Sequence, residues 1–142
     1  MKRILVTLLM ALALASQVLP AAESKPEKYR IVFELTSEGS QQFEALLNNL
    51  ENVRKALGPQ TEMLVVAHGP GLGLVQKTNT QSAERMKALA DQGVVFAACQ
   101  NTMKRKKLTR EDLLPFATTV DSGVAEVVRR QTTGWAYIKS GH

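Results

Sequence analysis

Apolar residues along this 142-residue chain are grouped in short runs, and polar turn residues separate the runs. Five of these runs are only a few residues long and rich in β-branched or aromatic side chains, which predicts buried strands. They cover residues 29–36, 62–68, 94–99, 117–120 and 135–139. Most of them are apolar along their whole length, and such strands are typical of a parallel sheet that is covered on both faces.

Between these runs, apolar residues recur at the spacing of amphipathic helices. Helices are predicted at residues 40–57, 81–91, 101–107 and 122–134, and the last is expected to turn its valines inward, namely Val124, Val127 and Val128. Thr109 and Asp112 have the spacing of a capped turn. The alternation of strands and helices predicts an α/β fold, a three-layer α/β/α sandwich with a mainly parallel five-stranded sheet. The pattern leaves the order of the strands open.

Residues 1–22 have the pattern of a secretory signal peptide. Lys2 and Arg3 form a basic start, and an apolar run at residues 4–15 follows that is too short to span a bilayer. Small residues at 21–22 or at 13–15 are possible cleavage sites, and a buried amino-terminal helix is the alternative interpretation. The sequence therefore predicts an exported, periplasmic protein with a single domain at residues 23–142 and no membrane insertion after cleavage.

The charge of the chain does not indicate a nucleic-acid partner. Of its 18 Lys and Arg residues, Lys2 and Arg3 belong to the expected signal peptide, so the mature chain has 16 basic and 13 acidic residues and a net charge of +3. Aromatic residues make up only 5% of the sequence. The basic run at residues 104–107 is therefore expected to be a solvated helix face or a surface that attracts a small anion.

Cys99 is the only cysteine, so the chain cannot form an internal disulfide. Because exported proteins usually carry cysteines in pairs, a single one indicates a possible reactive thiol. Cys99 ends a predicted strand and is followed by Gln100, Asn101 and Thr102 and by the start of the helix predicted at 101–107. The N–H groups of a helix start, together with the basic run at 104–107, would stabilise a thiolate and lower its pKa. The alternative is a buried and inert structural cysteine.

His68 ends the second predicted strand and precedes the turn Gly69-Pro70-Gly71-Leu72-Gly73. The turn has only part of the dinucleotide-binding fingerprint, and it lacks the lysine and hydroxyl residue of a Walker loop. We expect a tight turn in which Gly69 and Gly71 let the backbone approach a small ligand. His68 could act as an acid, a base or an orienting group, or it could be structural. Since parallel strands end at one edge of the sheet, His68 and Cys99 are expected at the same edge.

Metal and cofactor binding are not indicated. The only thiol and imidazole side chains belong to Cys99, His68 and His142, and they lack the spacing of a metal site. There is no G-x-S-x-G motif, although composition alone leaves a Ser-His-Asp triad open. Trp135 and Tyr137 lie on the same face of the last predicted strand, where they are expected in the core or at a subunit interface.

Three stretches of the sequence carry a resemblance to a known family. They are VVAHGPGL at 65–72, VVFAACQNTMKRKKL at 94–108 and LLPFATTVDSGVAEVVRRQTTGWAYIKSG at 113–141. With them, residues 29–141 resemble the exported branch of the DsrE/DsrF-like (DsrEFH) family of small sulfur-relay proteins. The resemblance implies an α/β/α sandwich that forms homotrimers or homohexamers. It also implies a role for Cys99, because in sulfur-relay members a cysteine at this position accepts sulfane sulfur as a persulfide.

The leading hypothesis from the sequence is a periplasmic, sulfurtransferase-like sulfur carrier. Cys99 would take sulfur from a donor and pass it to an acceptor, each of them a thiol protein or a small sulfur species. Gln100, Asn101 and Thr102 would donate hydrogen bonds around the sulfur, and His68 would supply a proton or a hydrogen bond. The alternative is an oligomeric binding module for a small anion or a protein partner, with a structural cysteine. A hydrolase or reductase is a third interpretation, for which the sequence offers no convincing second catalytic group.

Overall fold

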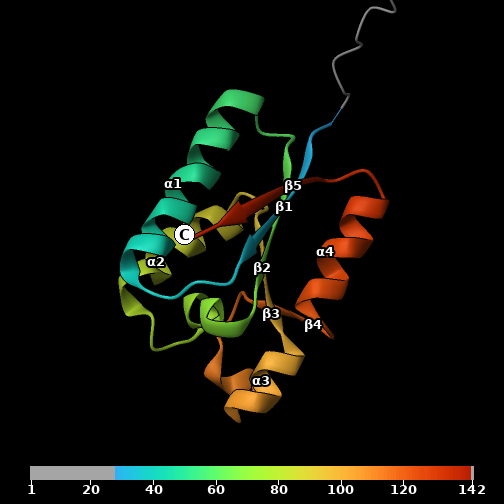
Figure 1. Cartoon of the computed structure of the whole chain (residues 1–142). Helices are drawn as coiled ribbons and strands as arrows, with labels where there is room; N and C mark the ends of the chain where they lie inside the picture. Colours follow the sequence, from blue (N-terminus) through green and yellow to red (C-terminus); the bar gives the residue numbers. More distant parts are fainter. Residues whose placement is uncertain (1–27, 142) are drawn as a thin grey trace, which may run out of the picture.

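A five-stranded parallel sheet lies at the centre of the computed structural model, which describes residues 28–141 (Figure 1). Its strands are β1 (Arg30–Leu35), β2 (Glu62–Ala67), β3 (Val95–Cys99), β4 (Thr118–Val120) and β5 (Ala136–Ser140). Across the sheet they follow the order β4-β3-β2-β1-β5, and every pairing is parallel. The predicted parallel sheet is confirmed.

The helices lie within a few residues of their predicted positions. They are α1 (Ser40–Leu57), α2 (Thr80–Asp91), α3 (Gln100–Lys106) and α4 (Gly123–Thr132), with short 3-10 helices η1 (Gly69–Val75) and η2 (Arg110–Asp112). The segment predicted as a glycine-rich turn is η1. The predicted capped turn is confirmed, because Thr109 and Asp112 form a capping box at the start of η2.

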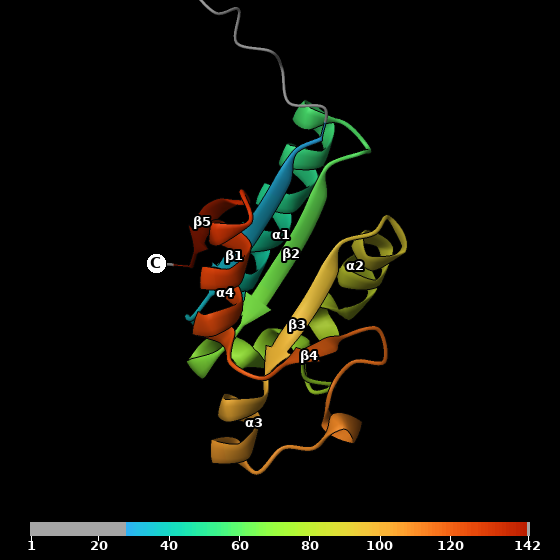
Figure 2. The ribbon, with the colours of Figure 1, turned by 90° about the vertical axis from the view of Figure 1, so that its right-hand side faces the viewer.

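The order of the strands decides which face each helix covers. From β1 to β4 each strand is added on the same side, and right-handed crossovers place α1 and α2 on one face of the sheet. The chain then returns in the opposite direction from β4 to β5, so the same handedness places α4 on the other face (Figure 2). The result is the predicted three-layer sandwich.

The two faces of the sheet are covered unequally. The larger core packs β-strand residues such as Phe33 and Phe96 against α1 and α2. On the other face, α4 contacts β1, β2 and β5, and the smaller core includes Val127. Val124 and Val128 are 59% and 53% exposed, so the prediction that they point inward was wrong.

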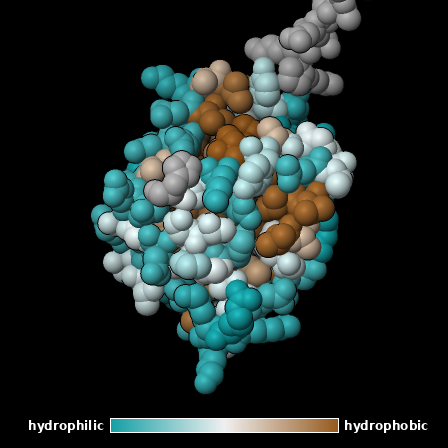
Figure 3. Space-filling view, in the orientation of Figure 1, coloured by the Kyte–Doolittle hydropathy of each residue, from teal (hydrophilic) through white to brown (hydrophobic). Residues whose placement is uncertain are grey.

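Val124 and Val128 are exposed because other residues of α4 face the sheet. Glu126 is buried beside Val127, and this carboxylate is compatible with burial because Arg129 and Arg130 both bind it, at 2.9 and 2.6 Å. The exposed valines contribute to a hydrophobic area over α4, and a second such area covers the carboxyl-terminal part of α1 (Figure 3).

The predicted signal peptide, residues 1–22, lies outside the described residues. Among the residues that are described, no helix has both the length and the hydrophobicity needed to cross a bilayer.

The helix η1 passes very close to the end of β1. A Cβ atom at Gly71 would lie 2.3 Å from the carbonyl oxygen of Leu35, a distance that real Cβ contacts do not reach. A Cβ at Gly73 would make only ordinary contacts, with the nearest atom of Phe43 at 3.5 Å. Glycine at 71 is therefore required by the backbone of β1.

This difference gives a matched pair of variants for stability. We expect Gly71→Ala to lower the free energy of unfolding by about 2 kcal/mol, because η1 must shift away from β1. Gly73→Ala should change it by no more than about 0.5 kcal/mol. Urea unfolding followed by circular dichroism measures both values, and equal stability of the two variants would contradict the close approach.

Candidate functional site

His68 and Cys99 lie at matching positions on neighbouring strands. Ala67 of β2 pairs with Ala98 of β3. The residue that follows Ala67 is His68, and the residue that follows Ala98 is Cys99. Because side chains alternate between the faces of a sheet, both belong to the face that α4 covers. Glu34 of β1 lies on this face too. The structure therefore brings the two predicted residues to the same edge of the sheet.

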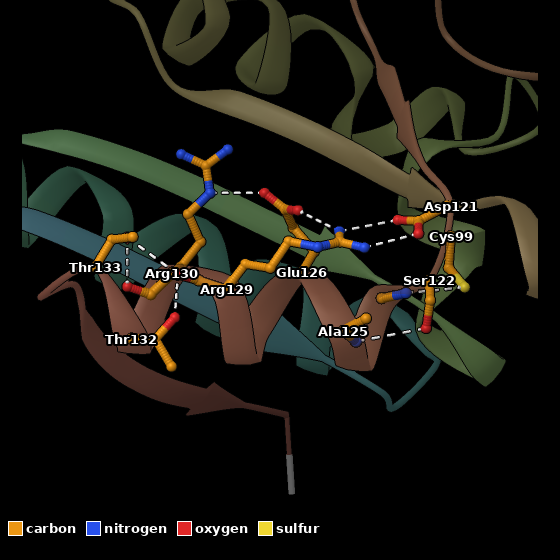
Figure 4. A network of polar contacts seen from close by, with 10 residues as sticks. Cys99, Asp121, Ser122, Ala125, Glu126, Arg129, Arg130, Thr132 and Thr133 are labelled. Carbon is orange, nitrogen blue, oxygen red and sulfur yellow. Dashed lines mark hydrogen bonds and ion pairs between the residues drawn. The ribbon is translucent and has the colours of Figure 1, made fainter.

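The sulfur of Cys99 binds the start of α4. Its Sγ atom accepts a hydrogen bond from the N–H group of Gly123, the first residue of α4, at 3.2 Å. The first N–H groups of a helix have no partner within the helix. The Ser122 hydroxyl accepts the N–H of Ala125 at 3.4 Å, and the sulfur accepts that of Gly123 (Figure 4). Because Cys99 is also the N-cap residue of α3, its sulfur lies near the starts of two helices.

Thr102 adds a hydroxyl donor to this environment. Its oxygen accepts hydrogen bonds from the N–H of Gly69 at 3.0 Å and from the guanidinium of Arg105 at 3.2 Å. A hydroxyl has two lone pairs and one proton, so both lone pairs are used and the proton is available to the Cys99 sulfur.

These donors lower the pKa of the Cys99 thiol below its usual value. Burial is the largest single influence and raises the pKa, since Cys99 is only 5% exposed. The N–H groups of Gly123, Thr102 and Asn101, together with the Thr102 hydroxyl, outweigh the effect of burial and favour the thiolate.

The basic residues of α3 contribute less directly than the sequence suggested. Lys104, Arg105 and Lys106 lie in the last turn of α3, at the opposite end from Cys99. Arg105 reaches the site through its hydrogen bond to Thr102. The pKa of Cys99 is lowered as expected, but fixed N–H and hydroxyl donors account for the direction of the shift.

A second group of polar side chains lies beside the thiol. His68 Nε2 is 2.8 Å from Oε1 of Glu34, and the Tyr137 hydroxyl donates to Oε2 of the same carboxylate. Burial raises the pKa of Glu34, but hydrogen bonds from Tyr137 and His68 and the charges of His68 and Lys139 lower it overall. The hydrogen bond to Glu34 in turn raises the pKa of Tyr137 to about 12. At neutral pH Glu34 is therefore ionised and Tyr137 keeps its proton.

Gly123 lies between His68 and Cys99. A Cβ atom at Gly123 would be 2.9 Å from Cδ2 of His68 and 3.0 Å from its Cβ and Cγ. Without a side chain, the first residue of α4 can rest against the imidazole ring and still donate its N–H group to Cys99. Gly123 therefore contacts both the Cys99 thiol and the His68 imidazole.

Two further contacts fix the start of α4. Arg129 binds both oxygens of Asp121, at 2.9 and 2.7 Å, and also binds Glu126 (Figure 4). The hydrogen bond from Arg129 holds the pKa of Asp121 at about 2, so the carboxylate stays charged at neutral pH. These ion pairs tie the turn before α4 to the helix itself.

The remaining predicted residues have different roles in the structure. The carboxamide of Gln100 donates to Thr119 Oγ1 at 3.0 Å, and Asn101 contributes its backbone N–H group to the thiol. Gly69 supplies the N–H bound by Thr102, while Gly71 lies against β1. Within residues 28–141, no three His, Cys, Asp or Glu side chains are grouped closely enough to hold a metal ion.

Glu34 and Gly123 were not predicted as site residues, and Tyr137 was expected only in the core or at an interface. Tyr137 is 38% exposed. A signal for Glu34 was present, because it is the one acidic residue in the apolar run 29–36. Gly123 follows the N-cap residue of a helix, where a glycine has no local advantage.

Thr102 provides a direct test of the thiol environment. We expect Thr102→Val to raise the pKa of Cys99, because a donor to the thiolate is lost while the side chain keeps its shape. The rate of iodoacetamide alkylation at neutral pH should fall several-fold, and its pH midpoint should move up. Thr102→Ser keeps the hydroxyl and should resemble the wild type. An unchanged midpoint in the valine variant, or a strong dependence on salt in the wild type, would contradict the assignment of the donors.

Comparisons with known proteins agree with this fold. The model of the DsrE/DsrF-like family matches residues 27–140. The solved structure of MTH1491, a protein of unknown function from Methanobacterium thermoautotrophicum, is 34% identical, with a TM-score of 0.74 over 78% of this chain and 98% of that chain. BT1422 from Bacteroides thetaiotaomicron, also of unknown function, shares only the fold, at 14% identity and a TM-score of 0.58 over 78% of this chain and 93% of its own. No curated protein matches the sequence. Since the family model spans nearly all of the described residues, the chain belongs to the DsrE/DsrF-like family, as its motifs suggested.

Proposed function

We propose that this protein carries sulfane sulfur as a persulfide on Cys99. The main observation is a single thiol whose pKa is lowered by N–H donors from the starts of two helices and by the Thr102 hydroxyl. The thiolate is the form of cysteine that attacks sulfur. Membership of the DsrE/DsrF-like family supports a role related to sulfur relay.

The transfer needs no external oxidant. The Cys99 thiolate attacks the outer sulfur of a persulfide donor, a new S–S bond forms, and the S–S bond of the donor breaks to release a thiolate. In the second half of the cycle, an acceptor thiolate attacks the outer sulfur on Cys99, and the Cys99 thiolate leaves. Donor and acceptor can each be a thiol protein or a small sulfur species.

Burial of Cys99 limits the shape of the donor. Only 5% of the residue is exposed, and Gly123 lies directly over the sulfur. A reactive Cys99 therefore requires a donor with a narrow reacting end, such as a terminal sulfane sulfur on an unbranched chain. The same burial favours the rival function, an oligomeric binding module in which Cys99 is structural.

The mass of the intact protein distinguishes these two functions. After incubation with a small persulfide donor and no reductant, we expect the mass to increase by one sulfur atom and to return to its original value with dithiothreitol. Cys99→Ala should show no increase. If the wild type gains no sulfur and its thiol reacts with iodoacetamide only after denaturation, the cysteine is structural and the carrier function is wrong.

We further propose that the mature chain is exported and forms a homotrimer or homohexamer. The signal-like pattern of residues 1–22 supports export. The exposed Val124 and Val128 support assembly, because large hydrophobic surface on a protein often marks an interface.

Native mass spectrometry of protein from the periplasmic fraction of its own host tests both parts of this proposal. We expect a subunit that begins near residue 22 or 23 and an assembly of three or six subunits. A subunit that retains residues 1–22 would contradict export, and a monomer at micromolar concentration would contradict assembly.

A further inference from the structure

His68, Glu34 and Tyr137 are not among the groups that contribute most to the pKa of the Cys99 thiol. We propose that His68 is the general acid of the transfer and protonates the thiolate that leaves the sulfur donor, with Glu34 as its positioning residue. This inference rests on the proposed sulfur transfer and adds a second reacting group to it.

The hydrogen bond to Glu34 assigns the two nitrogens of His68. An ionised carboxylate can only accept, so Nε2, which lies 2.8 Å from Glu34, is the nitrogen that donates. When the imidazole is protonated on both nitrogens, Nδ1 is then the nitrogen that can give a proton to a substrate. The Tyr137 hydroxyl holds the second oxygen of Glu34 and keeps the carboxylate in place.

The position of His68 suits a leaving group better than it suits the thiol. The sulfur of Cys99 already has its own donors, from Gly123 and from Thr102. In a linear displacement the leaving sulfur lies two S–S bonds from Cys99 Sγ, a separation of about 4 Å. His68 and Cys99 follow paired residues on neighbouring strands and share a face of the sheet, and the imidazole contacts Gly123, whose N–H group donates to the Cys99 sulfur. On this geometry we assign His68 to the side of the displacement from which the donor enters.

Protonation of the leaving group speeds its departure from the sulfur donor. A thiolate leaves more slowly as the pKa of its thiol rises, and ordinary alkyl thiols have a pKa of about 8.5. In the proposed step the Cys99 thiolate forms a bond to the outer sulfur, the donor S–S bond breaks, and its electron pair takes the proton from Nδ1. The products are the Cys99 persulfide, a neutral thiol and a neutral His68, which regains its proton from water.

The groups that surround His68 come from several elements. Glu34 faces it from β1, and behind Glu34 lie Tyr137 and Lys139 from β5. The Cys99 thiolate lies on β3, and α4 presents the uncharged Gly123.

Three thiol reagents that differ in their leaving group test this role. Iodoacetamide releases iodide, an activated aromatic disulfide releases an acidic thiol, and a simple alkyl disulfide releases a thiol of ordinary pKa. We expect His68→Gln to slow the reaction of Cys99 with the alkyl disulfide by about tenfold or more and to leave the other two rates near those of the wild type.

Two further variants separate this role from a structural one. Glu34→Gln should produce the same selective loss with a smaller magnitude, because His68 is retained but less firmly oriented. Glu51→Gln, which removes a comparable ion pair with Arg85 between α1 and α2, should change none of the three rates. Equal slowing of all three reagents in both site variants, or no change in any of them, would overturn the proposal.

The outcome is independent of whether Cys99 carries sulfur in the cell. If the wild type forms a persulfide and the selective loss is absent, only the acid role of His68 is wrong. If the selective loss is present and no persulfide forms, the acid role holds for thiol exchange and the sulfur-carrier function is wrong.

Discussion

The hydrogen bond from the Gly123 N–H group to the Cys99 sulfur is the contact on which the rest of the site depends. It joins the end of β3 to the start of α4 and satisfies an N–H group that the helix itself cannot satisfy. It also fixes the identity of residue 123, since a side chain there would collide with His68. The positions of the Cys99 thiol, the start of α4 and the His68 imidazole therefore all depend on the backbone of Gly123.

The source of the stabilisation determines how the thiolate responds to its surroundings. Exposed lysines near a cysteine act through solvent and are screened by salt, whereas buried N–H groups act at contact distance and are screened much less. The sequence showed the basic run after Cys99 plainly and showed nothing of the N–H group of Gly123, 24 residues away. The direction of the pKa shift of Cys99 was therefore predicted correctly, but its cause was predicted only in part.

Most of the fold could be predicted because periodicity and turn residues are local signals, and α1 was predicted with the bounds it has in the structure. Predictions that needed a distant partner were incomplete or wrong. Val124 and Val128 were placed inside because valine favours burial, but buried Glu126, neutralised by its arginines, occupies that side of α4. Thr102 was predicted as a donor, and only the structure shows the Gly69 N–H group that its oxygen accepts.

The parts of the site come from all along the chain, and this couples the chemistry to folding. Tyr137 on β5 and Glu34 on β1 are 103 residues apart, so their contact exists only once the last strand has joined the sheet. Before α4 reaches β3, the Cys99 thiol lacks the Gly123 donor and behaves more like a free cysteine. Because the folded state releases the thiol proton more readily than the unfolded chain, ionisation of Cys99 adds stability as the pH rises, and this stability is lost as the pH falls through the lowered pKa. The nucleophilic form of the cysteine is therefore a property of the completed fold.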